Sequence, residues 1–247
     1  MDKDKLNGEA PEVIFADVHN HSLFGVDDGA ADEEKMWEMV SHSYSEGVRY
    51  LCLTPHYHPG YYGDNIAASQ QAFDLLCRRC AESYPDLKLL LANELHYSEG
   101  CLSWIKDKQC RTMRGSRLVL VDFRENAEEA FIIKSLNRMT AAGYVPILAH
   151  AERYMKLSVG AIKMLKQDGI LVQINAGSCF GTFGARARHL AKKLLSLRLA
   201  DLVGSDGHNM NDRSPELRRC YEFIAKKYSR EYADFVCRDN AVSLFFE

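Results

Sequence analysis

Histidines and carboxylates recur in this sequence at spacings that suit metal binding. The segment from Asp17 to His21 reads D-x-H-x-H, and Asp206 and His208 form a D-x-H pair. Side chains two residues apart on an extended segment share a face, so each segment presents its ligands together. Imidazoles beside carboxylates suit a divalent cation such as Mn, Zn or Fe. The two segments therefore predict a metal centre.

Other candidate ligands follow short apolar runs along the chain. They are Asp28, His56, Glu94, Asp122 and His150. A single histidine at the end of a strand is more often an ordinary hydrogen-bonded residue than a ligand. The metal site is predicted by the full set, which appears in order on successive predicted strands.

The apolar runs themselves predict buried parallel strands, because they are continuous rather than alternating. The seven runs are Val13–Val18, Tyr50–Leu53, Leu87–Ala92, Leu118–Phe123, Val145–Ala149, Leu171–Ile174 and Ala200–Val203. In a parallel barrel or a doubly wound sheet, all carboxyl ends of such strands open on one face, where ligands collect.

Helical patterns fill most of the gaps between these runs. Glu33–Glu46 and Ala185–Leu197 are predicted helices. Two more helix starts are expected, one at a capping-box segment beginning with Asn126 and one at Ser214, which precedes a proline. Strand–helix alternation along the whole chain predicts a single α/β domain over residues 1–247.

Composition limits the class of protein. The formal net charge of −3 gives no basic surplus for nucleic acid, and no apolar run approaches the roughly 20 residues that cross a bilayer. The first 12 residues are charged, lack a secretory signal and are expected to form a flexible extension. Eight cysteines without disulfide spacing suit a reducing compartment. We therefore expect a cytoplasmic protein.

Four segments resemble the polymerase-and-histidinol-phosphatase (PHP) superfamily: Asp17–His21, Phe24–Gly29, Ala149–Tyr154 and Ser205–Asn209. The D-x-H-x-H and D-x-H segments mark the superfamily. The D-D-G at residues 27–29 and the H-x-E-R-Y at 150–154 most resemble the manganese-dependent tyrosine-protein phosphatases of bacterial capsule and exopolysaccharide operons. The similarity runs from about residue 14 to the C-terminus.

This resemblance implies a distorted seven-stranded (β/α) TIM-like barrel of PHP type with two or three divalent ions, Mn first, and Fe, Zn, Mg or Co as alternatives. Position by position, it implies a first metal held by His19, His21, Glu94 and Asp206, a second by Glu94, Asp122 and His150, and a third by Asp28, His56 and His208. The family usually has glutamate where this chain has Asp122. Asp17 is expected to orient a histidine ligand by hydrogen bonding.

The implied activity is hydrolysis of a phosphate monoester by a metal-activated water. The residues expected to activate that water are His19, His21, Glu94, His150 and Asp206. The expected substrate is a phosphotyrosine protein, with an autophosphorylating bacterial tyrosine kinase as partner. Two other functions stay open: a PHP-family phosphatase acting on histidinol phosphate or a sugar phosphate, and a non-catalytic metal-binding scaffold.

Candidate substrate residues flank the ligands. Arg153 and Arg213 are candidates for binding phosphoryl oxygens, since a guanidinium can bind two oxygens at once, although either could be an ordinary ion-pair residue. Tyr57, Tyr61 and Tyr62 either line a pocket for an aromatic ring or pack their own loop.

The remaining histidines and the cysteines receive no catalytic role. His42, His96 and His189 are interpreted as structural, and the spacing of His58 from His56 leaves its role open. A cysteine phosphatase needs an arginine six residues after its cysteine, and no cysteine here has that spacing. The Walker and dinucleotide-binding glycine motifs are absent as well.

Overall fold

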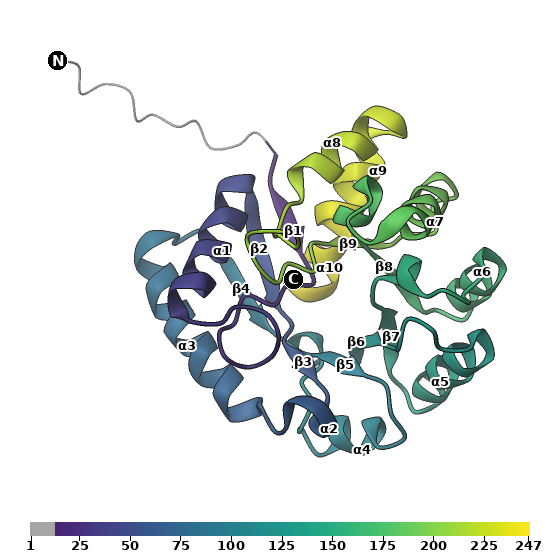
Figure 1. The fold of residues 1–247 in the computed structure, drawn as a ribbon, viewed down its shortest axis with the longest axis horizontal. Helices are drawn as coiled ribbons and strands as arrows, with labels where there is room; N and C mark the ends of the chain where they lie inside the picture. The colour runs from purple at the N-terminus through teal and green to yellow at the C-terminus, as the bar shows by residue number, and fades with distance from the viewer. Residues whose placement is uncertain (1–12) are drawn as a thin grey trace.

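The computed structural model describes residues 13–247. The predicted N-terminal extension, residues 1–12, lies outside the described residues. Parallel strands form a ring with helices packed around its outside (Figure 1). Within residues 13–247, no helix is both long and apolar enough to span a bilayer.

All seven predicted runs form strands, which confirms that part of the prediction. One sheet has the order β1 (Phe15–Asp17), β2 (Val48–Leu53) and β4 (Lys88–Leu91). The other has the order β3 (His56–Tyr57), β5 (Glu94–His96), β6 (Leu118–Asp122), β7 (Val145–Leu148), β8 (Leu171–Asn175) and β9 (Leu202–Gly204). Neighbouring strands are parallel throughout.

Two chain segments pass from one sheet to the other, which explains why the strands outnumber the seven runs. After β2 the chain bends at Pro55, whose missing N–H interrupts strand pairing, and continues as β3. After β4 it bends at Asn93, whose side-chain amide donates to the Pro55 carbonyl at 3.0 Å, and continues as β5. His56 and Glu94 therefore lie within short strands of the second sheet instead of directly after strands of the first.

The barrel closes between its first and last strands. The amide of Asp206 donates to the carbonyl of His19 at 2.8 Å, and the amide of His21 donates to the carbonyl of Gly207 at 2.9 Å. Gly204 permits this approach, because a Cβ there would lie 2.7 Å from the Cβ of His19. The result is a distorted TIM-like barrel built from seven chain segments.

A small apolar cluster fills the interior of the ring. It combines strand residues such as Ala16, Leu120 and Leu202 with Ala241 and Phe245 of the last helix, α10 (Asn240–Phe245). This helix lies at the centre of the ring in Figure 1. It packs at the amino ends of the strands, which leaves the carboxyl ends as the open face.

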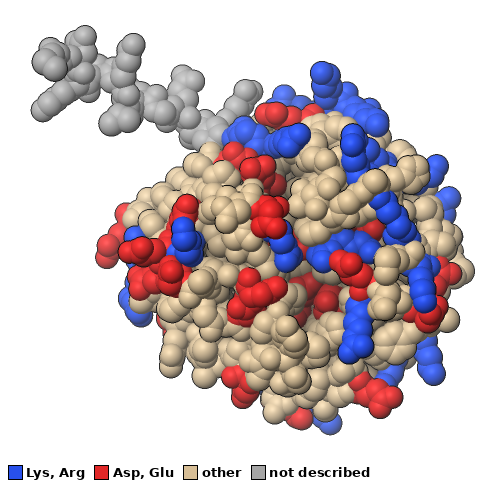
Figure 2. Space-filling model, viewed as in Figure 1, with Lys and Arg blue, Asp and Glu red and all other residues tan. Residues whose placement is uncertain are grey.

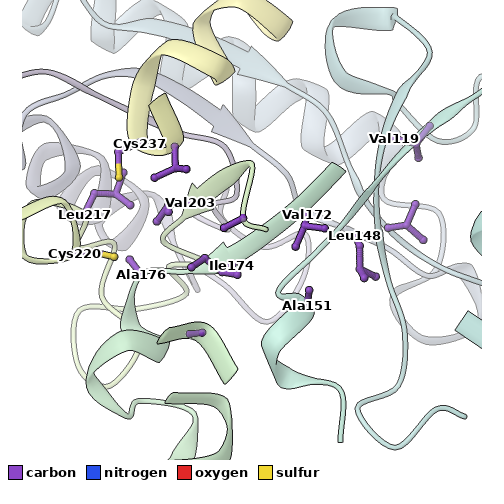
Figure 3. Close-up of a cluster of buried hydrophobic side chains, with 14 of the residues drawn as sticks. Val119, Leu148, Ala151, Val172, Ile174, Ala176, Val203, Leu217, Cys220 and Cys237 are labelled. Carbon is purple, nitrogen blue, oxygen red and sulfur yellow. The ribbon is translucent and has the colours of Figure 1, made fainter. Parts of the chain in front are cut away.

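The larger apolar cluster lies between the strands and the outer helices. Figure 3 shows part of it, with Leu148 and Val172 from adjacent strands and with Leu217 and Cys220 from the start of a later outer helix. The longer outer helices are α1 (Glu33–Glu46), α3 (Ile66–Ser83), α5 (Glu129–Ala141), α6 (Val159–Gln167), α7 (Gly184–Ser196) and α8 (Arg218–Lys227). Shorter ones are α2 (Pro59–Tyr62), α4 (Cys101–Lys106) and α9 (Arg230–Asp234), and 3-10 or π turns cover Met113–Gly115, Ala151–Arg153, Gly177–Phe180 and Phe235–Asp239.

The predicted helices α1 and α7 are confirmed, but two predicted helix starts are wrong. The amide of Ala127 donates to the Arg124 carbonyl, which holds Asn126 in a turn, and α5 begins three residues later than Asn126. Ser214 does not cap α8, which begins at residue 218. Pro215 packs closely against Gly207, where a Cβ would lie 2.7 Å from the proline Cβ, and the amide of Glu216 donates to the Ser214 carbonyl at 2.9 Å, so the segment turns at Pro215 before the helix begins.

Candidate metal centre

The structure brings all nine predicted ligands together at the carboxyl ends of the strands. The ligand atoms of eight of them form three overlapping groups, and within each group the atoms lie within 4.8 Å of one another: His21, Asp28, His56 and His208; His19, His21 and Glu94; Glu94, Asp122 and His150. The ninth, Asp206, lies beside His19 and His21. Viewed down the barrel, the surface is hollowed at its centre, where acidic side chains gather beside basic ones (Figure 2).

Glu94 lies at the middle of the ligand set. Its Oε1 is 2.8 Å from Nε2 of His150, and its Oε2 is 2.8 Å from Nδ1 of His56. The same Oε2 lies 3.2 and 3.3 Å from Nε2 of His19 and His21. This carboxylate is fully buried, so it can serve as a shared ligand for two groups of imidazoles.

The ends of β1 and β9 complete the first group from opposite sides of the barrel closure. The Nε2 atoms of His19 and His21 face each other at 3.0 Å. Asp206 Oδ1 lies 3.6 Å from the first and 3.5 Å from the second. Asp206 and His150 both have left-handed backbone, with φ of 54° and 32°, a conformation that is uncommon for non-glycine residues.

The imidazoles of the first group are oriented by two residues that the sequence prediction missed. Nδ1 of His19 is 3.2 Å from Oε1 of Gln173, and Nδ1 of His21 is 2.8 Å from Oδ2 of Asp27. Because these contacts occupy the Nδ1 atoms, the Nε2 atoms of both histidines are left to bind a common metal ion. Gly29 lets the Asp27 loop close over His21, because a Cβ there would lie 1.9 Å from the His21 carbonyl oxygen.

Asp17 does not orient an imidazole, which corrects its predicted role. Its carboxylate accepts hydrogen bonds from the hydroxyl and amide of Ser205, at 2.6 and 2.9 Å, and from the side chain of Asn20 at 3.1 Å. Its contact with His19 is to the backbone amide, at 3.4 Å. Asp17 sits deep in the seam between β1 and β9, so it fixes the backbone that carries the ligands.

His96 belongs to the site, although the sequence interpretation made it structural. His96 pairs in register with Asp122 across β5 and β6, and its Nδ1 lies 3.0 and 3.1 Å from the two carboxylate oxygens. The ring of His58 stacks on the ring of His96 with centroids 4.3 Å apart. His42 and His189 lie in α1 and α7 and belong to none of the three ligand groups.

The cluster shifts the pKa values of its members in opposite directions. Burial lowers the pKa of His19, but Glu94 and Asp206 more than offset this and raise it to about 9. Burial also lowers the pKa of His56, but the neighbouring Glu94 carboxylate outweighs burial and raises that pKa to about 10. His208, buried beside His21, has its pKa lowered to about 4. Although burial raises the pKa of Glu94, the surrounding imidazoles hold it well below its usual range.

Both candidate phosphate-binding arginines reach the ligand set. Arg153 Nη1 donates to Asp206 Oδ2 at 3.0 Å, and Arg213 Nη2 lies 2.9 Å from Asp206 Oδ1. The ring of Phe183 lies against both guanidinium groups, 4.5 Å from Arg153 and 5.7 Å from Arg213. Arg153 also donates to Glu125 at 2.7 Å, so both arginines are held at the site by carboxylates.

Two of the three candidate tyrosines border the site. Tyr62 stacks on His56 with centroids 5.4 Å apart and nearly parallel planes, and Tyr61 packs edge-on against Tyr62. Tyr61 is 75% exposed, so its ring remains free to contact a bound molecule. Tyr57 is buried against Trp104, so it takes the second of the two expected roles and packs its surroundings instead of lining the pocket.

Comparison with known proteins decides the family. The model of the family described as "Capsular polysaccharide synthesis, CpsB/CapC" matches residues 15–246. The chain belongs to the CpsB/CapC family. Among the CpsB/CapC relatives, the tyrosine-protein phosphatase CpsB of Streptococcus agalactiae is 28% identical over 235 residues, which cover 92% of this chain and 97% of that protein.

Two further comparisons agree with this CpsB/CapC assignment. Tyrosine-protein phosphatase YwqE of Bacillus subtilis is 26% identical over 217 residues, 87% of this chain and 85% of that protein. A solved structure, from work on YwqE of Bacillus subtilis and CpsB of Streptococcus pneumoniae as metal-dependent tyrosine phosphatases, superposes with a TM-score of 0.82. That comparison covers 92% of this chain and 93% of the other at 24% identity, and it shows a shared fold.

The ligand set of this CpsB/CapC chain fits divalent metal ions. His208 Nε2 and His150 Nδ1 are buried and have no hydrogen-bond partner within residues 13–247. Metal–ligand bonds of about 2.0–2.2 Å in a tetrahedral site place ligand atoms roughly 3.3–3.6 Å apart. The four atoms contributed by His19, His21, Glu94 and Asp206 have separations of 3.0–3.6 Å where they are in contact.

Proposed function

We propose that this chain is a metal-dependent protein tyrosine phosphatase. The observation that carries the proposal is the convergence of nine metal-type side chains on one face of the barrel, with two arginines and an aromatic wall beside them. The named CpsB/CapC relatives are tyrosine-protein phosphatases, which supports the same activity here.

The metal ligands are proposed as the three sets that the resemblance implies. One ion would be held by His19, His21, Glu94 and Asp206, a second by Glu94, Asp122 and His150, and a third by Asp28, His56 and His208. When bound, the cations supply Lewis-acid polarisation of the phosphoryl oxygens and lower the pKa of the attacking water. Mn²⁺ is the proposed ion on the strength of the family resemblance, and the mixed carboxylate and imidazole donors are compatible with it.

The chain's own residues bind the phosphate and orient the substrate. Arg153 and Arg213 each have donors directed into the site, and a guanidinium binds two phosphoryl oxygens with charge-assisted hydrogen bonds. Tyr62, stacked on His56, offers a flat face to a phenol ring. The phenol of tyrosine has a pKa of about 10, so its phenolate leaves readily and a dedicated general acid is not required.

The natural substrate is proposed to be a phosphotyrosine protein, and specifically an autophosphorylating bacterial tyrosine kinase, on the strength of the family resemblance. Such a substrate implies a cytoplasmic location for its phosphatase. All eight cysteines are free, and seven of them are buried, which suits a reducing compartment.

Three substrates and one chelator test this proposal. The purified protein is treated with a chelator, dialysed, and assayed on p-nitrophenyl phosphate, a phosphotyrosyl peptide and histidinol phosphate, with and without Mn²⁺. We expect no hydrolysis without metal and restored hydrolysis with Mn²⁺, with the peptide preferred over histidinol phosphate. Full activity in metal-free protein would refute the metal-dependent mechanism. A preference for histidinol phosphate would favour a small-molecule phosphatase. No hydrolysis of any of the three substrates would favour a non-catalytic metal-binding scaffold.

A further inference from the structure

A cleft extends from the metal ligands across the ends of β5 and β6. Next to the site is a cavity of about 380 Å³ bordered by His56, Asp122 and Tyr61. A second cavity of about 370 Å³ adjoins it, because both are lined by His58, His96 and Arg124. One such volume accommodates an aromatic side chain, so the second is available for another part of the substrate.

An arginine without an ion-pair partner among the described residues lies on the wall shared by the two cavities. Arg124 is exposed and forms no ion pair with any of residues 13–247. The acidic residues that follow Arg124 in the sequence already have other partners. Glu125 pairs with Arg153 at 2.7 Å, Glu128 forms an ion pair with Lys156, and Glu129 accepts from the amide of Ser158 at 2.6 Å.

The far cavity has an aromatic lining. The rings of Tyr97 and Phe123 stack with centroids 5.3 Å apart, and Phe131 on α5 packs edge-on against Tyr97 at 5.8 Å. Phe131 nevertheless remains 49% exposed. An exposed aromatic ring beside a free guanidinium is typical of a protein-binding surface, where aromatic residues and arginine are enriched.

We propose that this cleft binds the polypeptide segment next to the phosphotyrosine, with an acidic residue against Arg124 and an apolar side chain against Phe131. The inference rests on the proposed phosphatase activity and adds a preference for particular residues next to the phosphotyrosine of the substrate. An acidic flank matches the unpaired guanidinium, and an apolar residue covers the part of the Phe131 ring that the protein leaves exposed. A lysine-containing flank would instead meet a like charge.

Matched peptides test the charge preference. Three peptides carry one phosphotyrosine and differ only in the flanking residues: aspartate with leucine, lysine with leucine, and aspartate with serine. Each is compared with p-nitrophenyl phosphate, which has no flank. We expect kcat/KM for the aspartate–leucine peptide to exceed that of each other peptide by about fivefold, the ratio that corresponds to roughly 1 kcal/mol.

Two variants assign the preference to named residues. Arg124→Glu should reverse the preference between the aspartate and lysine peptides, and Phe131→Ala should remove the preference for leucine over serine. Arg117→Ala is the control for charge, because Arg117 is exposed at the opposite end of the same strand. Met164→Ala is the control for an exposed apolar side chain, since Met164 is 50% exposed on α6. Both controls should keep the wild-type ranking of peptides.

The outcomes separate this inference from the function on which it rests. Failure to hydrolyse p-nitrophenyl phosphate and all three peptides would overturn the phosphatase proposal itself. Hydrolysis of all peptides at equal kcat/KM would overturn only the peptide-binding cleft. The peptide-binding cleft would also be overturned if Arg124→Glu melted at the wild-type temperature and still preferred the aspartate peptide over the lysine peptide.

Discussion

Replacing Arg153 with alanine should weaken phosphate binding without removing metal. Its guanidinium is 18% exposed, faces the ligand set and donates to Asp206 at 3.0 Å. Asp206 keeps two other partners in the variant, Arg213 at 2.9 Å and the side-chain amide of Asn175 at 2.7 Å. Because the carboxylate stays paired and Arg153 is not a ligand, we expect Arg153→Ala to fold and to bind its metal ions fully.

The size of the kinetic effect follows from the contact that is lost. A charge-assisted hydrogen bond contributes about 1.5–3 kcal/mol, so kcat/KM on a phosphotyrosyl peptide should fall by roughly 10- to 150-fold. Loss of the stacking on Phe183 should cost about 0.5–1 kcal/mol of folding stability. That smaller effect appears as a lower Tm and leaves the kinetics of the folded protein unchanged.

The assay measures kcat and KM on the peptide with saturating Mn²⁺, together with metal content and Tm. Arg117→Ala removes one exposed positive charge just before the amino end of β6, away from the ligand set, and should match wild type in kinetics, metal content and Tm. Wild-type kinetics in Arg153→Ala would exclude Arg153 from phosphate binding. A drop in metal content would instead mean that Arg153 acts by positioning Asp206.

Asp122→Ala should lower metal content and turnover, whereas Asp122→Glu, about 1.3 Å longer, should retain or improve metal affinity; full metal content and turnover in Asp122→Ala would remove this residue from the ligand set. Binding of Mn²⁺ should release protons, because the pKa values of His19 and His56 are raised to about 9 and 10 and an imidazole must be neutral to bind metal. Affinity should therefore increase as the pH rises from 6 to 8, and calorimetry showing no proton release would contradict this. Cys179→Ser should leave kcat within about threefold, since the buried thiol has no nucleophile context, and loss of turnover with intact metal content would reverse that conclusion.

The sequence was sufficient to predict the strands and the convergence of the nine ligands. Continuous apolar runs such as Leu118–Phe123 mark buried parallel strands, and the carboxyl ends of parallel strands must meet on one face. The candidate ligands are then the residues that stand at these ends or in the loops that follow them. These inferences need only local sequence patterns and the rule that the carboxyl ends of parallel strands share one face. They therefore do not depend on the details of side-chain packing.

The partners of the ligands depend on register between strands and could not be predicted in the same way. Gln173 reaches His19 from β8, and nothing in its own neighbourhood marks it as polar support for an imidazole. His96 is different, because Glu94 and His96 have the same two-residue spacing that drew attention to His19 and His21. That spacing was a usable signal, and the structure shows both side chains in the site.

The packing of α10 inside the ring has a consequence for how the protein is made. All nine ligands precede residue 209, but the floor beneath them is not in place until Ala241 and Phe245 have been added. A nascent chain that ends before α10 therefore exposes the apolar interior of its barrel. Such a fragment is a natural target for chaperones and proteases, and a complete site forms only after α10 has been synthesised and has packed inside the ring.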